Sequence, residues 1–514
     1  MQFIKTDLKR LDEIIFNPSL FRIAYIIDLF LGMLAFLEPT SLVLKCLILS
    51  WGALIFIHNF IKTKAFLKIK YYKILILFLG LCLFTTLLHF NDNLLANLLF
   101  IYHTSICFFM FYGMNVQNDK KSIEKEMVFI FKFITISTTL LSCLGLLIFA
   151  FKTQINIQDY WLGIYQNRFI GVYSNPNLLA FSCVLSIIFG YMLTQKDTLG
   201  QYTKNKHLYI ASIIINICAL ILSDSNASLL FFILYIIVLI FYKLFSNKTF
   251  FSISDIIKRS TLLVLCCLVL FLLTFGLRNF VQDKVAIFVN DIHQSQEPIH
   301  DNKNEFENII TEEEVTDDDS NDNEEESIEE AVEIGRDPLS GSYDVSSGRI
   351  TLLKQSLIMF KNHPFFGVGR GNIVEYGLRE IPGGLRFSDF HNGYVTILVS
   401  WGTIGFIIFS SFALMLAIDM CKSLFNMGKN RDSKIYSNLF SIIVSYAFYS
   451  LFEKTILSEI TFMVVIFWLI LGYASTYINV RNNFAKEGLN YEGKLLNRQK
   501  YTFRRRGFII KYKI

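Results

Sequence analysis

The longest apolar run of the chain, residues 394–420, reads YVTILVSWGTIGFIIFSSFALMLAIDM and contains one charged residue, Asp419. A helix rises about 1.5 Å per residue, so a run of this length can cross the roughly 30 Å hydrocarbon core of a bilayer. Strands of globular proteins are shorter, at about 3–10 residues. The run therefore predicts a transmembrane helix.

The composition of the whole chain agrees with a membrane protein. Of the 514 residues, 53% are hydrophobic and only 18% are charged, and the mean hydropathy is +0.45. Soluble proteins carry about 25% charged residues, so the composition excludes a soluble globular enzyme. The chain is also too apolar to be disordered. Its apolar runs are too long for the strands of a transmembrane β-barrel.

Twelve apolar runs are candidates for spanning a bilayer. They are residues 21–37, 41–60, 74–89, 94–114, 127–151, 178–193, 208–222, 227–245, 262–277, 394–420, 435–451 and 460–478. The sequence therefore predicts an all-α polytopic membrane protein with twelve transmembrane helices. Spans one to nine would occupy residues 1–277 and spans ten to twelve residues 394–480, followed by a basic tail at 481–514.

Lysine and arginine indicate how the spans are oriented. They are frequent in every second inter-span segment and in the C-terminal tail, while the short segments on the opposite side contain few besides Lys152, Arg168 and Lys454. Cytoplasmic loops are enriched in Lys and Arg, so both termini are predicted to be cytoplasmic. Two longer loops, 152–177 and 278–393, would then be external, the second between spans nine and ten. The basic tail suits anionic lipid headgroups.

Few ionisable or metal-binding groups fall inside the predicted spans. Asp28 is the clearest, with Arg22 about a turn and a half before it, and both a functional role and pairing with a nearby cation are open. The nine cysteines lie in or beside apolar runs, and none stands near a histidine at the spacing of metal ligands. They predict buried free thiols and no metal site. The first apolar run lacks a small-residue cleavage site and is expected to be the first span rather than a signal peptide.

The large external loop has two parts that differ in composition. Residues 305–333 contain fifteen carboxylates and no Lys or Arg, so the rest of a chain of net charge +5 carries +20. Such a run repels itself and has little to bury, which predicts a disordered tether. Calcium binding is the alternative, but the D-x-[DN]-x-[DN]-G loop is missing. Residues 346–362 begin with capping serines and repeat apolar residues at helical spacing, which predicts an amphipathic helix on the outer membrane surface.

Candidate functional residues gather in the two external loops. Arg168 stands in N-R-F-I-G-V-Y-S-N-P-N directly before span six, where it could also be a simple interfacial anchor. Arg349 opens the amphipathic helix, and Arg370 follows it in N-H-P-F-F-G-V-G-R-G-N. His391, in D-F-H-N-G-Y, immediately precedes span ten. The glycine-rich string is not a dinucleotide-binding loop, because no strand precedes it.

The order of these motifs resembles the O-antigen ligase and O-antigen polymerase superfamily. The sequence has R-x-x-G-x-x-x-N-P-N before a span, an Arg that opens a helix, H-P-x-x-G-x-G-x-x-N, and H-N-x-Y before W-G-x-I-G. Members are bacterial integral-membrane glycosyltransferases with a similar number of spans and a large external loop between spans nine and ten. The resemblance is most specific over residues 348–405. One departure is Ser-Asn-Ala at 225–227, where members often have Ser-Arg-Gly, and the acidic run is not a family feature.

The resemblance implies transfer of a glycan from an undecaprenyl-diphosphate carrier to a sugar hydroxyl, without a metal or a cofactor. Arg168 and Arg349 match the functional arginines of the family, and His391 matches its functional histidine. Arg370 and Arg386 are further candidates for binding the diphosphate. The chemistry is consistent, because arginine is a planar, permanently charged donor to a leaving diphosphate. Histidine can accept the proton of the attacking hydroxyl.

Several activities remain compatible with the sequence. One is polymerisation of lipid-linked repeat units into a surface polysaccharide such as O-antigen, capsule or exopolysaccharide. Another is ligation of a finished glycan to a lipid core, a wall polymer or a protein. A flippase for lipid-linked oligosaccharides would instead need cations lining a cavity at membrane depth and inverted repeats, whereas the arginines gather in loops. A sensor or structural component is the remaining alternative.

The expected surroundings of the protein follow from the resemblance. The predicted location is the bacterial cytoplasmic (inner) membrane. The expected partners are the undecaprenyl-diphosphate-linked oligosaccharide donor, the glycan acceptor and membrane lipids. A chain-length regulator and a flippase of the same pathway are further expected partners, and no nucleic acid is expected.

Overall fold

The computed structural model describes most of the membrane part of the chain and little of the large external loop. The described residues are 12–37, 41–151, 155–157, 160–165, 168–245, 254–255, 257–270, 272, 274, 276, 349–385, 390–427, 430–457 and 459–486. The acidic run 305–333, the serines before Arg349, Arg386 and the end of the basic tail lie outside these residues.

Every predicted span overlaps a helix among the described residues. These helices are α2 (Pro18–Leu31), α3 (Ser41–His58), α4 (Tyr72–Leu88), α5 (Leu94–Ile106) with the π-helical turn η3 (Cys107–Tyr112), α7 (Lys120–Ala150), α8 (Pro176–Thr194), α9 (Lys206–Leu222), α10 (Asn226–Phe245), the helical residues 257–270, α14 (Gly393–Asn426), α15 (Arg431–Tyr449) and α16 (Phe462–Lys486). The prediction of an all-α polytopic membrane protein is confirmed. By length and composition, 6 helices of the described part can cross a membrane, and the total of twelve stays a prediction.

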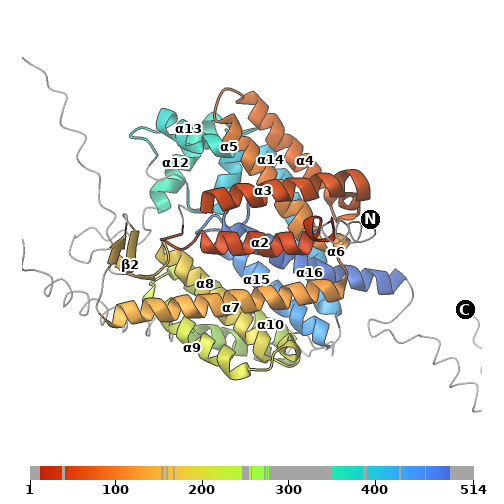
Figure 1. Cartoon of the computed structure of the whole chain (residues 1–514), viewed down its shortest axis with the longest axis vertical. Coiled ribbons are helices and arrows are strands. Elements are labelled where there is room, and N and C mark those ends of the chain that lie inside the picture. The colour runs from red at the N-terminus through yellow and green to blue at the C-terminus, as the bar shows by residue number, and fades with distance from the viewer. Residues whose placement is uncertain are drawn as a thin grey trace, which may run out of the picture.

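Shorter elements connect the long helices. They are η1 (Asn59–Thr63), η2 (Ala65–Lys68), α6 (Met114–Gln117), η4 (Gly200–Tyr202), α12 (Arg349–Asn362), η6 (Arg370–Asn372), α13 (Ile373–Glu380) and the strands β1 (Ile155–Ile157), β2 (Tyr160–Tyr165) and β3 (Arg168–Gly171). Most of the long helices lie side by side, with β2, α12 and α13 at the same end of the bundle (Figure 1). In the described part, α8 packs between α7 and α9, α10 packs on α15, and α14 packs on α4.

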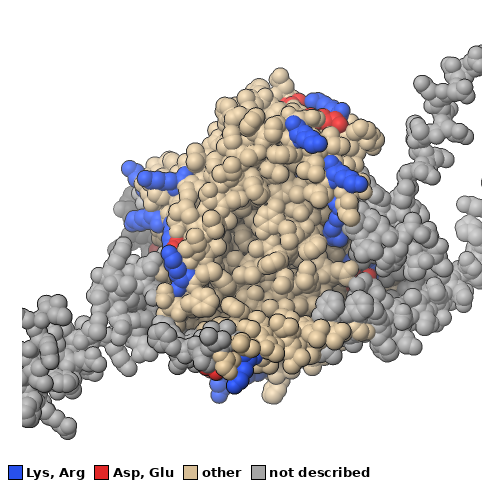
Figure 2. Space-filling model, turned by 180° about the vertical axis from the view of Figure 1, so that it is seen from behind, with Lys and Arg blue, Asp and Glu red and all other residues tan. Residues whose placement is uncertain are grey.

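The outer surface of the helices is suited to lipid. Figure 2 shows a wide face without charged residues, with Lys and Arg along its margins. Large apolar side chains such as those of Val43, Leu140 and Leu208 are more than half exposed. Contiguous apolar surface of this kind is unfavourable in water, whereas lipid tails are as apolar as the side chains.

One buried ion pair joins helices that are far apart in the sequence. Nε of Arg22 in α2 donates to Oε1 of Glu126 in α7 at 2.8 Å, and Nη2 donates to Oε2 at 2.6 Å. The remaining amino group, Nη1, donates to the carbonyl oxygen of Met110 in η3 at 3.0 Å. Arg22 thus pairs with Glu126 and not with Asp28. The carboxylate oxygens of Asp28 are buried and have no hydrogen-bond partner in the described part of the chain.

The first external loop folds as a small antiparallel sheet that the sequence reasoning did not predict. Its strand order is β1-β2-β3, and Tyr165 pairs with Arg168 across the turn between β2 and β3. A close glycine contact holds the sheet on α7, because a Cβ at Gly145 would lie 2.7 Å from Cα of Gly171. The sheet therefore fixes where Arg168 lies relative to the helices.

The helix predicted over 346–362 corresponds to α12, whose described residues begin at Arg349. Leu352, Ser356 and Met359 pack inward, whereas Ile350, Leu353 and Leu357 remain exposed. The outward face is thus the apolar face that the sequence assigned to the outer membrane surface. The inward face of α12 packs on protein, and its exposed apolar face is suited to contact with lipid.

A cluster of polar side chains fastens α13 to the turn between α4 and α5. The hydroxyl of Tyr376 donates to Asp92 at 2.9 Å and lies 2.8 Å from Nδ1 of His89. Burial, together with the hydrogen bond to Asp92, raises the pKa of Tyr376 to about 12, so the hydroxyl keeps its proton. Nε2 of His363 lies 2.6 Å from Oε1 of Glu380, which closes the segment between α12 and α13.

Helix α14 is broken at Gly402, which has a φ of 64° and a ψ of −173°. The break removes the helical partners of two carbonyl groups. The N–H of Val368 donates to the carbonyl of Val399 at 3.1 Å, and the N–H of Gly369 donates to that of Ser400 at 2.9 Å. The glycine-rich string after α12 therefore supplies the hydrogen bonds that the helix has lost.

The same segment also satisfies the other side of the break. In an unbroken helix the N–H groups of Thr403 and Ile404 would donate to carbonyls four residues back. They donate instead to the carbonyls of Pro364 at 2.8 Å and Phe365 at 3.2 Å. The backbone of the string H-P-F-F-G-V-G thus inserts into the break in α14. At Gly402 this backbone leaves no room for a Cβ.

We expect Gly402→Ala to destabilise the protein strongly. A Cβ there would lie 2.2 Å from the carbonyl oxygen of Phe365, and a positive φ with an extended ψ, which is essentially restricted to glycine, costs an alanine about 1–3 kcal/mol. The measurement is the temperature at which half of the detergent-solubilised protein loses its monodisperse size-exclusion peak. The matched control is Gly80→Ala in α4, where a Cβ meets no atom within 4 Å. Equal midpoints for the two variants would contradict the role given to Gly402.

Candidate functional site

Arg168 is placed by the sheet and by the N-P-N sequence that starts α8. The side chain of Asn175 caps the helix by accepting from the N–H of Asn177 at 2.7 Å, and Pro176 occupies the first turn. The side chain of Asn177 is therefore available for other contacts. Nη2 of Arg168 donates to its Oδ1 at 2.9 Å, and Nε of Arg168 donates to the carbonyl of Ser223 at 3.1 Å.

The second contact brings Arg168 to the turn between α9 and α10. Nη2 also lies 3.4 Å from the carbonyl oxygen of Asp224, and the hydroxyl of Ser225 donates to Oδ1 of Asn177 at 3.0 Å. This is the turn where members of the resembling superfamily often have Ser-Arg-Gly and this chain has Asn226. Although this chain has no arginine in the turn itself, the guanidinium of Arg168 in β3 contacts the backbone of the turn.

The D-F-H-N-G-Y string fastens the start of α14 to the loop after α15. The side chain of Asn392 caps α14 by accepting from the N–H of Tyr394 at 3.0 Å, and its Nδ2 donates to the carbonyl of Leu451 at 3.0 Å. The N–H of Gly393 donates to the carbonyl of Ser450 at 2.8 Å. This short segment of chain puts His391 next to the loop that contains Glu453.

The carboxylate of Glu453 contacts or lies near side chains from several segments of the site. Its Oε1 accepts from Nδ2 of Asn177 at 3.2 Å, and its Oε2 lies 3.4 Å from Nδ1 of His391. Nη2 of Arg349 lies 4.0 Å from Oε1. The Glu453 side chain is only 11% exposed, so its charge is poorly solvated and benefits from these partners. The start of α12, the segment before α14 and the start of α8 therefore meet at one carboxylate.

The contact with Glu453 orients the imidazole of His391. An ionised carboxylate only accepts hydrogen bonds, so a hydrogen bond here requires the proton on Nδ1 and leaves Nε2 as the basic nitrogen. The backbone of His391 has a φ of 45°, in the left-handed region that few residues other than glycine adopt. Strained backbone of this kind is concentrated at functional sites.

Arg349 is the first residue of α12 and retains unused hydrogen-bonding capacity. Its guanidinium lies over the ring of Phe452 at 5.9 Å, and its Nε is buried without a hydrogen-bond partner among the described residues. The side chain is 32% exposed, so the group is accessible from outside. A buried cationic N–H that lacks an acceptor is unfavourable by itself, and an anionic ligand would satisfy it.

Arg370 belongs to a neighbouring ion cluster on the same loop. Its Nε donates to Oε1 of Glu459 at 2.9 Å, and Nζ of Lys454 donates to the same oxygen at 2.9 Å. The guanidinium also lies 5.2 Å from the ring centroid of Phe100. Arg370 is 7% exposed, so it is more enclosed by protein than Arg168 and Arg349 are.

The structure thus separates the five predicted site residues into three groups. Arg349 and His391 lie next to Glu453, and Arg168 is linked to it through Asn177. Arg370 pairs with Glu459, and Arg386 lies outside the described residues. The sequence reasoning missed Glu453, which joins the site together. A signal was present, because the short segment between spans eleven and twelve contains two carboxylates.

One comparison with known proteins gives a match. Residues 211–410 match a family model described as O-antigen ligase. The matched segment begins in α9 and ends in α14, and it contains Arg349, Arg370, Arg386 and His391. No curated protein matches the chain. The match covers about two fifths of the chain, and together with the order of the motifs it supports a similarity to the O-antigen ligase and O-antigen polymerase superfamily.

Proposed function

We propose that the protein transfers a glycan from an undecaprenyl-diphosphate carrier to a sugar hydroxyl and so polymerises repeat units of a surface polysaccharide. The family match indicates a membrane glycosyltransferase of the O-antigen ligase and polymerase type. The observation that carries the proposal is that Arg349 and His391 lie next to Glu453, to which Arg168 is linked through the side chain of Asn177. These groups supply the two functions that the reaction needs, an anion clamp and a base.

The first function is to stabilise the leaving group. As the acceptor oxygen bonds to the anomeric carbon, the bond from that carbon to the diphosphate breaks and negative charge develops on the diphosphate. The guanidinium groups of Arg168 and Arg349 would neutralise this charge, so the proposal needs no metal. Glu453 limits the repulsion between these cations and the imidazole before the donor binds.

The second function is to remove the proton of the attacking hydroxyl. Nε2 of His391 would accept this proton, since Nδ1 faces Glu453 at 3.4 Å. The carboxylate would then stabilise the imidazolium that forms. Glu453 is thus a positioning residue in the proposal, because it acts on the hydroxyl only through His391.

A second candidate is ligation of a finished glycan to a different acceptor, which the description of the matched family favours. The two activities share the donor chemistry and differ in the acceptor. Purified protein supplied with lipid-linked repeat units alone distinguishes them. A ladder of longer lipid-linked products supports polymerisation, whereas transfer that requires an added lipid core, wall polymer or protein supports ligation. The proposed setting remains the bacterial inner membrane, with the site on the external side.

We expect Arg349→Lys to insert normally and to lose activity by roughly 10²-fold, the typical effect of removing one donor to a developing charge. Lysine keeps the charge but not the planar pair of N–H donors. The measurement is product formed from lipid-linked donor by purified protein. The matched control is Arg379→Lys, because Arg379 is an exposed arginine of α13 that pairs with Glu375 outside the site. Wild-type activity in Arg349→Lys would remove Arg349 from the anion clamp.

We expect His391→Asn to fold normally and to lose activity by about 10²–10⁴-fold, the typical contribution of a general base. Asparagine is the informative substitution because it tolerates the left-handed φ of 45° and forms hydrogen bonds, but it cannot accept the proton. The measurement is the rate of transfer as a function of pH. The residual activity of the variant should lack the acidic limb that histidine titration gives to the wild type. An unchanged profile would mean that His391 only positions the acceptor.

A further inference from the structure

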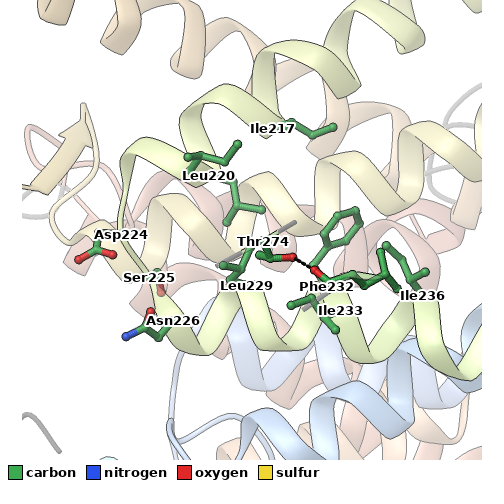
Figure 3. A pocket seen from close by; sticks show the side chains of 12 residues that line it. Ile217, Leu220, Asp224, Ser225, Asn226, Leu229, Phe232, Ile233, Ile236 and Thr274 are labelled. Atoms are coloured by element: carbon green, nitrogen blue, oxygen red, sulfur yellow. Dashed lines mark hydrogen bonds between the residues drawn. The ribbon is translucent and has the colours of Figure 1, made fainter. Parts of the chain in front are cut away.

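Ionisable side chains that the proposed function does not use gather where α13 meets the turn between α4 and α5. His89 follows the last residue of α4, Asp92 lies in the turn, and Tyr376 contacts both from α13. The apolar pocket beside α9 and α10 is different, because Asp224 is the one titratable side chain among the described residues that line it (Figure 3). The cluster of His89, Asp92 and Tyr376 is thus a place where a change of pH can act directly on the structure.

The hydrogen bonds of the cluster determine how many protons it holds. A tyrosine hydroxyl has one proton, and that of Tyr376 is donated to Oδ2 of Asp92 at 2.9 Å. Nδ1 of His89 lies 2.8 Å from the same hydroxyl oxygen, so this nitrogen must carry a proton and donate it. Nε2 of His89 lies 3.2 Å from the carbonyl oxygen of Gly367, which only accepts. Both ring nitrogens therefore carry protons, and His89 is an imidazolium in this arrangement.

The surrounding charges favour this additional proton on His89 rather than on Asp92. Oδ1 of Asp92 lies 3.8 Å from Nη1 of Arg379, and a nearby guanidinium favours an ionised carboxylate. Oδ2 of the same carboxylate lies 3.9 Å from Nδ1 of His89, where it favours the imidazolium. The other ionisable groups that face the cluster, in α13 and directly after α12, form pairs of their own, which are Arg379 with Glu375 and His363 with Glu380.

We propose that His89, Tyr376 and Asp92 form a proton-binding site, and that the bound proton fastens α13 and the glycine-rich string to the end of α4. With the proton in place, the imidazolium donates to Tyr376 and to the carbonyl of Gly367. When the proton leaves, one of these two hydrogen bonds is lost, and Asp92 loses a neighbouring cation. Histidine changes its charge between about pH 5 and 8. The contact is therefore strengthened as the pH falls and weakened as it rises.

The predicted loosening is confined to α13, because the string is held on α14 by groups that do not titrate. The N–H groups of Val368 and Gly369 donate to carbonyls of α14, and the hydroxyl of Thr85 donates to the carbonyl of Phe366 at 2.9 Å. The insertion of the string into α14 should thus survive loss of the proton. Its amides provide an internal reference for those of α13.

The direct test is hydrogen exchange of the full-length protein in nanodiscs at about pH 5.5 and about pH 8, which bracket the ordinary titration of histidine. After correction for the intrinsic effect of pH on exchange, we expect the amides of residues 373–380 to exchange roughly tenfold faster at the higher pH, as loss of one hydrogen bond to a charged group predicts. The amides of Val368 and Gly369 should keep the same protection at both. Equal protection of 373–380 at the two pH values would overturn the proposal.

A pair of variants identifies the group that titrates. In His89→Gln the side chain still forms hydrogen bonds but does not change its charge, so the pH difference in α13 should disappear. The matched control is His363→Gln, which removes the neighbouring imidazole, whose ring lies 5.9 Å from that of His89 and whose Nε2 faces Glu380. This variant should keep the pH difference. The opposite result, with the difference lost only in His363→Gln, would assign the effect to His363 and refute the proposal.

Nitrogen-15 spectra of the wild type with labelled histidine provide a measurement that does not depend on the stability of a variant. We expect the His89 ring to have two N–H groups at about pH 5.5 and one at about pH 8, changing together with exchange in α13. A His89 ring with a single N–H at both pH values would contradict the hydrogen-bond assignment. None of these experiments measures donor binding or glycan transfer, so their outcome is independent of the proposed function.

Discussion

The external end of the molecule depends on one constraint, which is that backbone groups inside a bilayer must find hydrogen-bond partners within the protein. The break at Gly402 frees groups on both sides of the kink in α14, and the backbone of residues 364–369 pairs with them. This insertion determines where α12 ends and where Arg370 and α13 begin. A chain segment that could otherwise lie loosely on the surface is thus built into a transmembrane helix.

Short sequence motifs also determine where the residues of the candidate site lie. Asn175 caps α8, whose residue Asn177 contacts both Arg168 and Glu453. Asn392 caps α14 and donates to the loop after α15, which puts His391 close to that loop. Glu453 in that loop then joins side chains from separate parts of the chain. Arg370 illustrates the contrast, because Glu459 pairs with it directly and so offsets its charge.

The sequence predicted the helices well because long apolar runs have one explanation in a membrane protein. The resemblance also predicted a site with Arg168, Arg349, Arg370, Arg386 and His391, and their role in that site stays a prediction. The small sheet at 155–171 was missed because short strands are recognised by their partners, which no local pattern reveals. Glu453 was missed for a similar reason, since its importance lies in contacts with residues from other segments. Arg22 appeared closest to Asp28 in sequence, yet Glu126 is its partner from 104 residues away.

The buried pair of Arg22 and Glu126 has a consequence for how the protein is made. An arginine without a partner is costly inside a bilayer. During synthesis α2 emerges well before α7, and at roughly 5–20 residues per second the intervening 104 residues take roughly 5–20 s. Until then Arg22 lacks the carboxylate that pairs with it in the folded protein. The first helices therefore mature as one biogenesis unit whose completion waits for α7, even though α3, α4 and α5 are already present.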